Sequence, residues 1–168
     1  DPDSLDPARA AARATRQIAE KLAGVAKALE AAGHHPEPVA GFLTRCLVSL
    51  FAEDVGLLPQ RSFTELLDAL TQTPEQFVPL VGALWREMDA GGYSVVLRQT
   101  LPRFNGKLFK SPAEGSLVLP LDRDQIDLLR EAAGADWTQV EPAIFGTLLE
   151  RALDPAWRRG NGLHLTPG

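Results

Sequence analysis

The sequence holds little of several residue types, and each shortage excludes a class of protein. Only one of its 168 residues is cysteine, which excludes an internal disulfide and a metal site built from cysteine thiolates. No apolar run approaches about 18 residues, so we expect no membrane-spanning helix, and we expect no signal peptide in this sequence. The net charge of −5 argues against a nucleic-acid-binding protein that relies on bulk positive charge alone.

The familiar sequence signatures of catalysis are missing as well. The chain has no phosphate-binding loop, no dinucleotide-binding glycine motif, no Gly-x-Ser-x-Gly nucleophile motif and no His-Glu-x-x-His zinc motif. His34 and His35 are adjacent and have no second ligand cluster near them in the sequence, so we expect a solvated turn there. Cys46 falls in an apolar stripe and is expected to be a buried side chain rather than a nucleophile.

Glu53 and Asp54 form an acidic pair at the expected end of a helix, just before Gly56. The helix dipole disfavours anions at this end by about 0.3–1 kcal/mol each, so a partner elsewhere in the fold is expected. One interpretation is a general acid–base pair. Because adjacent side chains point about 100° apart on a helix, we favour a salt bridge or a cap for a neighbouring loop.

Apolar residues recur at helical spacing along most of the chain and predict an all-α fold. We expect a single irregular helical domain of about six helices, with one long loop or hairpin insertion around 93–121. The expected helices are 8–32, a stretch that starts near 39 and ends before 56, one that begins at the capping pattern of 62–65, and one that begins at 73–76 and ends at 91–92. A further helix is expected from Asp122 or Asp124 to Gly134, and a last one from 142. The side chains expected in the core are Phe42, Cys46, Leu50, Phe77, Leu84, Trp85, Trp137, Phe145 and Leu149.

Helix starts are marked by local capping patterns. Asp6 and Pro7 suit the N-cap and the first helical position. The segment from Ser62 to Glu65 has the pattern of a capping box, and Thr73 to Gln76 repeats it. These starts support the helical prediction.

The insertion around 93–121 has a different composition. Residues 93–97 favour a strand, and the turn signal lies at 104–106. Residues 90–113 contain no acid, and their four cations are Arg98, Arg103, Lys107 and Lys110. We expect these residues either to contact the phosphates of a DNA backbone or to form a solvated loop that pairs with acids such as Glu53 and Asp54.

Four ordered segments together resemble a known family. Residues 42–59, FLTRCLVSLFAEDVGLLP, look like the helical spacer of MmeI-like, type II restriction–modification, adenine-specific DNA methyltransferases. Three later segments agree in the same order: FNGKLF at 104–109, DWTQVEPAIFGTLLE at 136–150 and RRGNGLHLTP at 158–167. They span most of the chain from position 42 onward.

The resemblance implies a role inside a larger protein. In that family the spacer joins a nuclease or accessory region to an adenine-N6 methyltransferase domain. The last segment is similar to the Gly-x-His-Tyr-Thr-Pro element that opens that domain, with Leu165 in place of the tyrosine. The resemblance therefore implies a helical spacer domain over 1–157 and, over 158–168, the start of the linker into a methyltransferase domain. The residues that it places at the edge of the S-adenosylmethionine pocket are Gly162, His164, Thr166 and Pro167.

The expected function is accordingly that of a non-catalytic connector. It would position the catalytic domain of a site-specific adenine-N6 DNA methyltransferase, of the restriction–modification or phage-defence type, and contact the DNA backbone. The cofactor of the parent protein would be S-adenosylmethionine, with none bound by this segment. The expected partners are double-stranded DNA and the methyltransferase domain, in the cytoplasm and without a membrane.

Two other function classes stay open at the level of the sequence. One is a helical protein–protein interaction module, supported by the apolar stripe of the helix at 8–32, which could dock on a partner. The other is a small enzyme that uses Glu53, Asp54 or the histidine pair.

Overall fold

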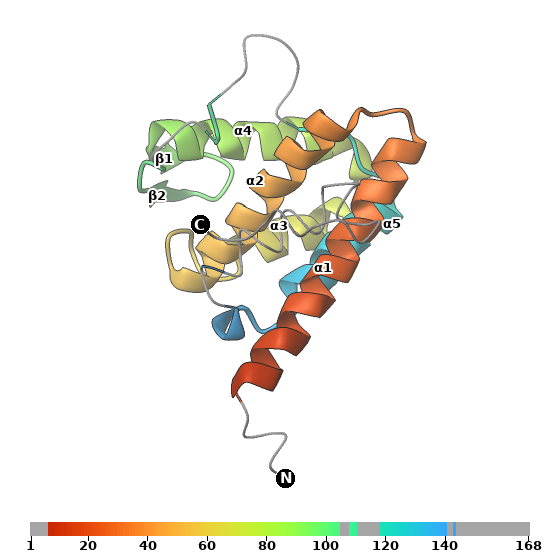
Figure 1. Cartoon of the computed structure of the whole chain (residues 1–168). Helices are drawn as coiled ribbons and strands as arrows, with labels where there is room; N and C mark the ends of the chain where they lie inside the picture. Colours follow the sequence, from red (N-terminus) through yellow and green to blue (C-terminus); the bar gives the residue numbers. More distant parts are fainter. Residues whose placement is uncertain (1–6, 105–107, 111–117, 141–142, 144–168) are drawn as a thin grey trace. The chain divides into compact units, whose positions relative to one another are not determined.

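The computed structural model describes residues 7–104, 108–110, 118–140 and 143, and within them the fold is mainly helical (Figure 1). The helices are α1 (Pro7–Ala31), α2 (Pro36–Val55), α3 (Ser62–Leu70), α4 (Phe77–Ala90) and α5 (Arg123–Ala133). Short 3-10 turns, η2 (Pro74–Gln76) and η3 (Trp137–Gln139), accompany them. The strands β1 (Gly92–Ser94) and β2 (Gln99–Leu101) form one small antiparallel sheet. The all-α prediction with one hairpin insertion is confirmed, and the expected helix from 142 lies outside the described residues.

The chain divides into two compact units. One unit, the terminal unit, comprises residues 1–43 and 128–168, and the other, the central unit, comprises residues 44–127. The two divisions fall inside α2 and inside α5.

In the terminal unit, α1 presents the apolar stripe that the sequence predicts. The side chain of Leu128 approaches α1 at Gly24, where a Cβ atom would lie 3.2 Å from Leu128 Cδ1. Lys21 and Glu131 form an ion pair at 2.8 Å across the same two helices. The buried stripe residues are Ile18, Leu22, Val25 and Leu29.

The end of α1 follows from its sequence. Gly33 has φ +102°, a conformation that suits glycine after a helix. The N–H of Gly33 donates to the carbonyl of Glu30 at 3.0 Å, and the N–H of His34 donates to the carbonyl of Leu29 at 3.1 Å. These two bonds are those of a Schellman motif. The helix expected over 8–32 thus ends within one residue of its predicted end.

The central unit is built around a buried indole. Trp85 on α4 is fully buried, and its Nε1–H donates to Ser49 Oγ on α2 at 2.9 Å. Ser49 Oγ in turn donates to the carbonyl of Arg45 at 2.8 Å, so the polar atoms of both side chains are satisfied. Of the predicted core residues, Phe145 and Leu149 lie outside the described residues. The others are confirmed as buried: Phe42, Cys46, Leu50, Phe77, Leu84, Trp85 and Trp137.

The capping box expected at Ser62 is wrong. Ser62 is already the first residue of α3, the N-cap is Arg61 with φ 60°, and no side chain of the N-cap bonds to the helix. The Oγ of Ser62 is buried without a hydrogen-bond partner among the described residues. At Thr73, which precedes the 3-10 turn η2, the N-cap side chain also makes no bond to a backbone N–H.

Glu53 takes the place of the local cap at α3. Its Oε1 accepts the N–H of Phe63 at 2.8 Å and the N–H of Thr64 at 2.9 Å, and its Oε2 accepts the Thr64 hydroxyl. The prediction of a capping role for this acid is therefore confirmed. Because the cap comes from ten residues earlier in the chain, no short-range pattern could identify its target.

Candidate nucleic-acid interface

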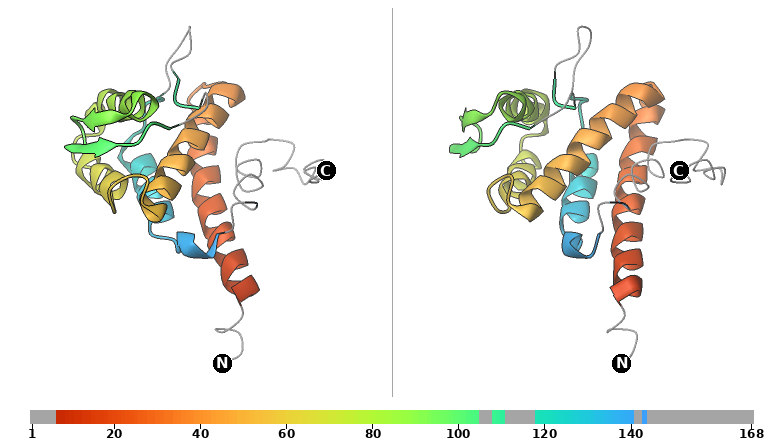
Figure 2. Two further views of the ribbon diagram at one scale, coloured as in Figure 1. Left: turned by 90° about the vertical axis from the view of Figure 1, so that its left-hand side faces the viewer. Right: turned by 60° about the vertical axis from the view of Figure 1, so that its left-hand side comes forward.

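The insertion forms a β-hairpin beside α4 in the central unit (Figure 2). Gly92 pairs with Leu101 and Ser94 pairs with Gln99. The chain turns between these strands at residues 95–98, where the N–H of Arg98 donates to the Ser94 carbonyl at 2.7 Å. Arg98 has φ 60°. A hairpin is thus present in the insertion, as expected, but its turn overlaps the stretch 93–97 that was expected to be a strand. The turn signal at 104–106 lies after β2 and partly outside the described residues.

Glu87 on α4 holds the turn of the hairpin. One carboxylate oxygen of Glu87 accepts the hydroxyl of Ser94, and the other accepts the N–H of Val95 at 2.8 Å. The Ser94 oxygen also accepts the N–H of Leu97 at 2.9 Å. Each of these bonds fixes a backbone or side-chain position in the turn that carries Arg98. No pattern in the sequence indicated this role of Glu87.

The other end of the hairpin is fixed by close backbone contact. Gly91 has φ +73°, and a Cβ atom added there would lie 2.9–3.0 Å from backbone and Cβ atoms of Arg103. The N–H of Phe104 donates to the Met88 carbonyl at 2.9 Å. Only glycine fits at position 91, since any side chain would push against the segment that carries Arg103.

Aromatic contacts hold residues 104 and 109, which follow the hairpin, against each other and against α4. The rings of Phe104 and Phe109 meet edge to face with centroids 5.7 Å apart, and Phe109 also packs on Trp85 at 5.9 Å. Arg45 on α2 donates its Nε–H to the carbonyl of Leu108 at 2.7 Å. Burial lowers the pKa of the Arg45 guanidinium from its ordinary value.

The structure brings some of the expected phosphate-binding cations together and separates others. Arg103 and Lys110 adjoin the contacting pair Phe104 and Phe109 in the sequence, so they lie at one end of the insertion. Arg98 lies at the opposite end, in the hairpin turn. Lys107 is outside the described residues. Arg98, Arg103 and Lys110 are all exposed.

These exposed cations do not pair with the acids that the alternative interpretation named. Glu53 is bound to the start of α3. Within the described ranges, no ion pair or side-chain hydrogen bond joins Arg98, Arg103 or Lys110 to another residue. Exposed cations without a counter-charge can attract the phosphates of a nucleic-acid backbone. We call Arg98, Arg103, Lys107 and Lys110 the basic insertion.

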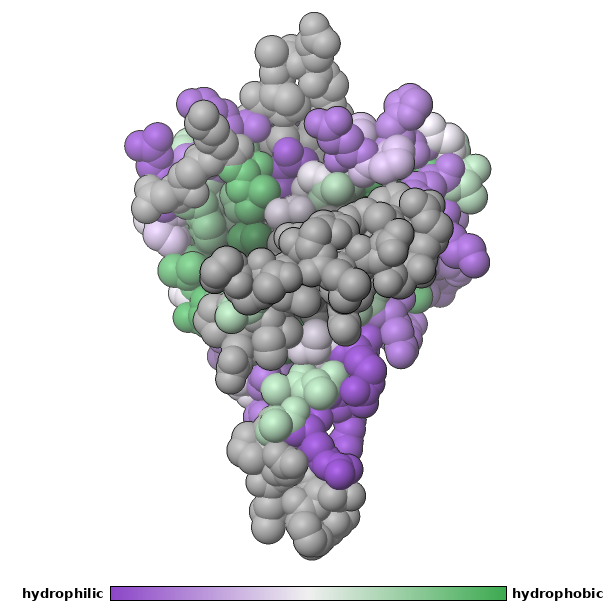
Figure 3. Space-filling view, in the orientation of Figure 1, coloured by the Kyte–Doolittle hydropathy of each residue, from purple (hydrophilic) through white to green (hydrophobic). Residues whose placement is uncertain are grey.

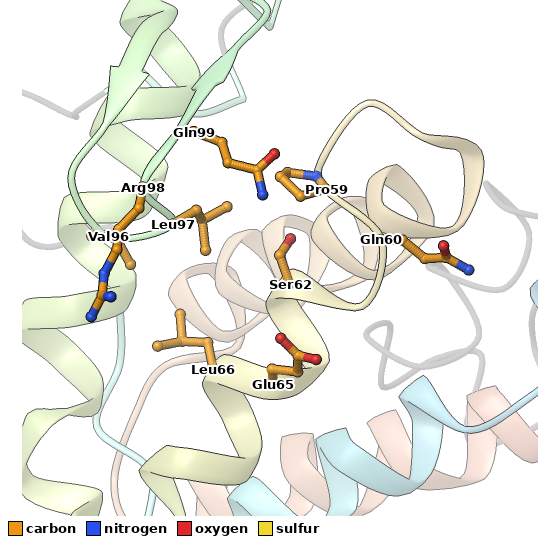
Figure 4. Close-up of a pocket in the computed structure, with 9 residues that line it drawn as sticks. All are labelled: Pro59, Gln60, Ser62, Glu65, Leu66, Val96, Leu97, Arg98 and Gln99. Carbon is orange, nitrogen blue, oxygen red and sulfur yellow. The ribbon is translucent and has the colours of Figure 1, made fainter.

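An open groove of about 350 Å³ lies beside the hairpin, also within the central unit. Leu97 and Gln99 point toward it from the hairpin, and Ser62 points toward it from α3 (Figure 4). The charged residues among those that line it are Glu65 and Arg98. Sequence reasoning missed this groove because its two walls come from separate parts of the chain. The lining residues are Pro59, Gln60, Ser62, Glu65, Leu66, Val96, Leu97, Arg98 and Gln99.

The remaining candidate residues have structural roles or lie outside the described residues. His34 and His35 occupy the turn between α1 and α2, as expected. Cys46 is fully buried, and burial raises the pKa of its thiol. Among the described residues, no group of three or more histidine, cysteine or acidic side chains could hold a metal ion. The residues expected at the cofactor pocket, Gly162, His164, Thr166 and Pro167, are outside the described residues.

Among the described residues, no helix combines the length and the apolar character that crossing a membrane requires.

Comparisons with known proteins identify what residues 37–109, which include most of the central unit, resemble. Residues 37–109 match the family model described as the helicase spacer domain of MmeI. The match includes α2, α3, α4 and the hairpin. It contains two of the four segments on which the resemblance rested, at 42–59 and 104–109.

A curated relative extends the similarity. A protein named DNA methyltransferase A, from Bacillus subtilis (strain 168), is 28% identical over 129 residues. The aligned part covers 74% of this chain and 14% of that protein, so the chain spans a small part of the relative's length. No solved structure matches the chain. The resemblance inferred from the sequence is confirmed, because residues 37–109 of this chain match the helicase spacer domain of MmeI.

Proposed function

We propose that this chain is a non-catalytic helical spacer of an S-adenosylmethionine-dependent adenine-N6 DNA methyltransferase, of the restriction–modification or phage-defence type. The observation that supports it most is the match of residues 37–109 to a spacer domain, together with the similarity to DNA methyltransferase A. The spacer would hold the methyltransferase domain in register on double-stranded DNA. The cytoplasm is the proposed compartment, since a DNA-modifying protein must share a compartment with its substrate.

A non-catalytic role agrees with what the described residues do. Glu53 is occupied as the cap of α3, and Cys46 is buried as an un-ionised thiol. A nucleophile or general base has to reach its substrate, and neither group is accessible. Catalysis would then belong to the adjoining methyltransferase domain.

The basic insertion is the proposed contact with the DNA backbone. Its described cations, Arg98, Arg103 and Lys110, are exposed and unpaired within the described ranges. Their backbone positions are fixed by Glu87, by the contact at Gly91 and by the Phe104–Phe109 pair. Cations on a pre-organised support lose less conformational freedom on binding than cations on a loose loop.

The cofactor is proposed for the parent protein and not for this segment. S-adenosylmethionine would supply the methyl group there, and Gly162, His164, Thr166 and Pro167 would border its pocket. This part of the proposal rests on the resemblance alone.

The interaction-module alternative depended on an exposed apolar stripe on α1. Ile18, Leu22 and Val25 of that stripe are fully buried within the chain. Since no other observation favours that function, we do not propose it.

The DNA contact is tested by the salt dependence of binding. The full-length protein is titrated into a labelled duplex of about 30 base pairs, roughly three helical turns, at several salt concentrations. Each phosphate contact contributes about 0.9 to the slope of log K against log salt. Replacing Arg98, Arg103, Lys107 and Lys110 with alanine should therefore lower the slope by about 3–4 and weaken binding. Unchanged affinity and slope would refute the contact.

A matched control separates this surface from general loss of charge. Arg123 is an exposed cation of the central unit outside the insertion. Arg123→Ala should leave the slope unchanged, whereas Arg103→Ala, with the same change in charge, should lower it by about 1.

A further inference from the structure

The first turns of α1 carry a second concentration of positive charge. Residues 7–19 contain three arginines and no acid, whereas the six residues before them contain three aspartates, and the first turn of the helix has no acidic residue. Helices commonly place acids in the first turn, because the helix dipole favours negative charge there.

The arginines lie on one exposed stripe of α1. The stripe follows the spacing i, i+3, i+4, i+7, i+8 and i+11, so its members share one face of the helix. Deep purple, the most hydrophilic colour, gathers over this part of α1 just above the grey residues (Figure 3). The exposed residues of the stripe are Arg9, Ala12, Arg13, Arg16, Gln17 and Glu20.

Arg13 and Arg16 are available to a partner. Both are exposed, and within the described part of the chain neither forms an ion pair or a side-chain hydrogen bond. Arg9 has contacts of its own and does not belong to the available pair. Because residues three apart on a helix have Cβ atoms about 5–6 Å apart, the two guanidinium groups can reach neighbouring sites on one partner.

The chemistry of the stripe favours a polyanion over a protein surface. Protein–protein interfaces depend on apolar and aromatic anchors at their centre, and the exposed stripe has none. Ala12 between the arginines has a small side chain that permits close approach. Guanidinium groups match phosphate oxygens in geometry and in charge.

We propose that Arg13 and Arg16 form a second phosphate-binding surface of this chain, which contacts the backbone of double-stranded DNA. The inference rests on the proposed function, because it assigns the same DNA to a second part of the same chain. It is independent of the basic insertion, which belongs to the central unit, whereas α1 belongs to the terminal unit.

The test compares the DNA binding of variants that lack different cations of α1. Full-length protein with Arg13→Gln and Arg16→Gln is titrated into a labelled duplex of about 30 base pairs. Two lost contacts should lower the salt slope by about 1.8 and weaken binding severalfold. Lys27→Gln is the matched control for Arg13→Gln, since Lys27 is exposed on the same helix about 21 Å further along at 1.5 Å per residue. The control should bind like the wild-type protein.

The outcomes separate this proposal from that of the insertion. A normal slope in the Arg13→Gln, Arg16→Gln protein, or an equal loss with Lys27→Gln, overturns the second surface. If the Arg13→Gln, Arg16→Gln protein has a lower salt slope while the protein with alanine at the four cations of the basic insertion binds normally, the second surface is supported. The DNA contact of the basic insertion is then refuted. No binding by the wild-type protein refutes both. Glutamine keeps a high helix propensity, so an unchanged melting temperature should show that the variants are folded.

A conservative pair of substitutions tests the kind of contact. Arg13→Lys with Arg16→Lys keeps both charges and should keep the salt slope, because phosphate binding follows charge. A loss of slope in this protein would contradict a backbone contact.

Discussion

Glu53 near the end of α2 accepts the backbone N–H of Phe63 at 2.8 Å, so the acid caps a helix that begins nine residues later. The same carboxylate binds the N–H and the hydroxyl of Thr64. It thereby satisfies two of the four N–H groups that any helix leaves unpaired at its start. An anion at this position also benefits from the dipole of α3.

Removal of this cap should destabilise the protein strongly. Glu53→Ala leaves two buried N–H groups without their charged acceptor, and we expect a loss of about 2–3 kcal/mol in the free energy of unfolding. Glu65→Gln removes an exposed carboxylate from α3, the helix that Glu53 caps, and should change stability by less than about 0.5 kcal/mol. Urea unfolding of both variants measures the difference. Equal stabilities would show that Glu53 is not the cap.

The two consecutive glycines after α4 should respond differently to alanine. Gly91 and Gly92 both have positive φ, but only at Gly91 would the new Cβ meet the backbone of Arg103. We expect Gly91→Ala to cost about 3 kcal/mol and Gly92→Ala about 1–2 kcal/mol. Thermal unfolding ranks the two variants. A smaller loss for Gly91→Ala than for Gly92→Ala would contradict the close approach.

Glu87 is expected to act as a positioning residue for the hairpin. Glu87→Ala removes the acceptor of the Val95 N–H and of the Ser94 hydroxyl. Amide hydrogen exchange at Val95 and Leu97 should become faster, because the turn loses the bonds that hold it. Asp89→Ala on the same helix provides the control and should leave both amides unchanged. Equal exchange in the two variants would exclude the positioning role.

The buried thiol should make stability fall at alkaline pH. Burial raises the pKa of Cys46 in the folded chain, whereas an unfolded cysteine titrates near about 8.5. Stability from this group is complete below the unfolded pKa and is lost as the pH rises above it, by up to about 1.4 kcal/mol per pH unit. The comparison of wild-type protein with Cys46→Ala between about pH 8 and pH 10, on either side of the unfolded pKa, isolates this loss. Parallel pH profiles would show that the thiol ionises equally in both states.

Local interactions decided which parts of the fold could be predicted. Gly33 ends α1 through bonds that all lie within residues 29–34. Asp122 and Gln125 cap the start of α5 reciprocally, with both backbone-to-side-chain distances at 2.9 Å. Such features are contained in a short window of sequence. The helical fold and most of its core could be predicted for this reason.

Tertiary contacts decided what could not be predicted. The pattern at Ser62 matched a capping box, but Glu53 already occupies the N–H groups of Phe63 and Thr64. The acidic pair Glu53 and Asp54 indicated a partner elsewhere in the fold, but the sequence did not show which residues form it. The cations of the basic insertion could be identified from their composition, whereas the role of Glu87 in holding their hairpin required the structure.

Methylation kinetics of the full-length protein test the spacer account most directly. The methylation rate is measured for the wild-type protein and for a variant with alanine at the four cations of the basic insertion. The concentration of a duplex substrate is varied, with S-adenosylmethionine as methyl donor. A non-catalytic spacer that contacts the DNA backbone predicts that alanine at Arg98, Arg103, Lys107 and Lys110 raises KM for DNA by about tenfold or more. It also predicts that kcat stays within about twofold, because uniform binding is lost and not transition-state binding. A fall in kcat with unchanged KM, or the absence of DNA methylation by the wild-type protein, would contradict it.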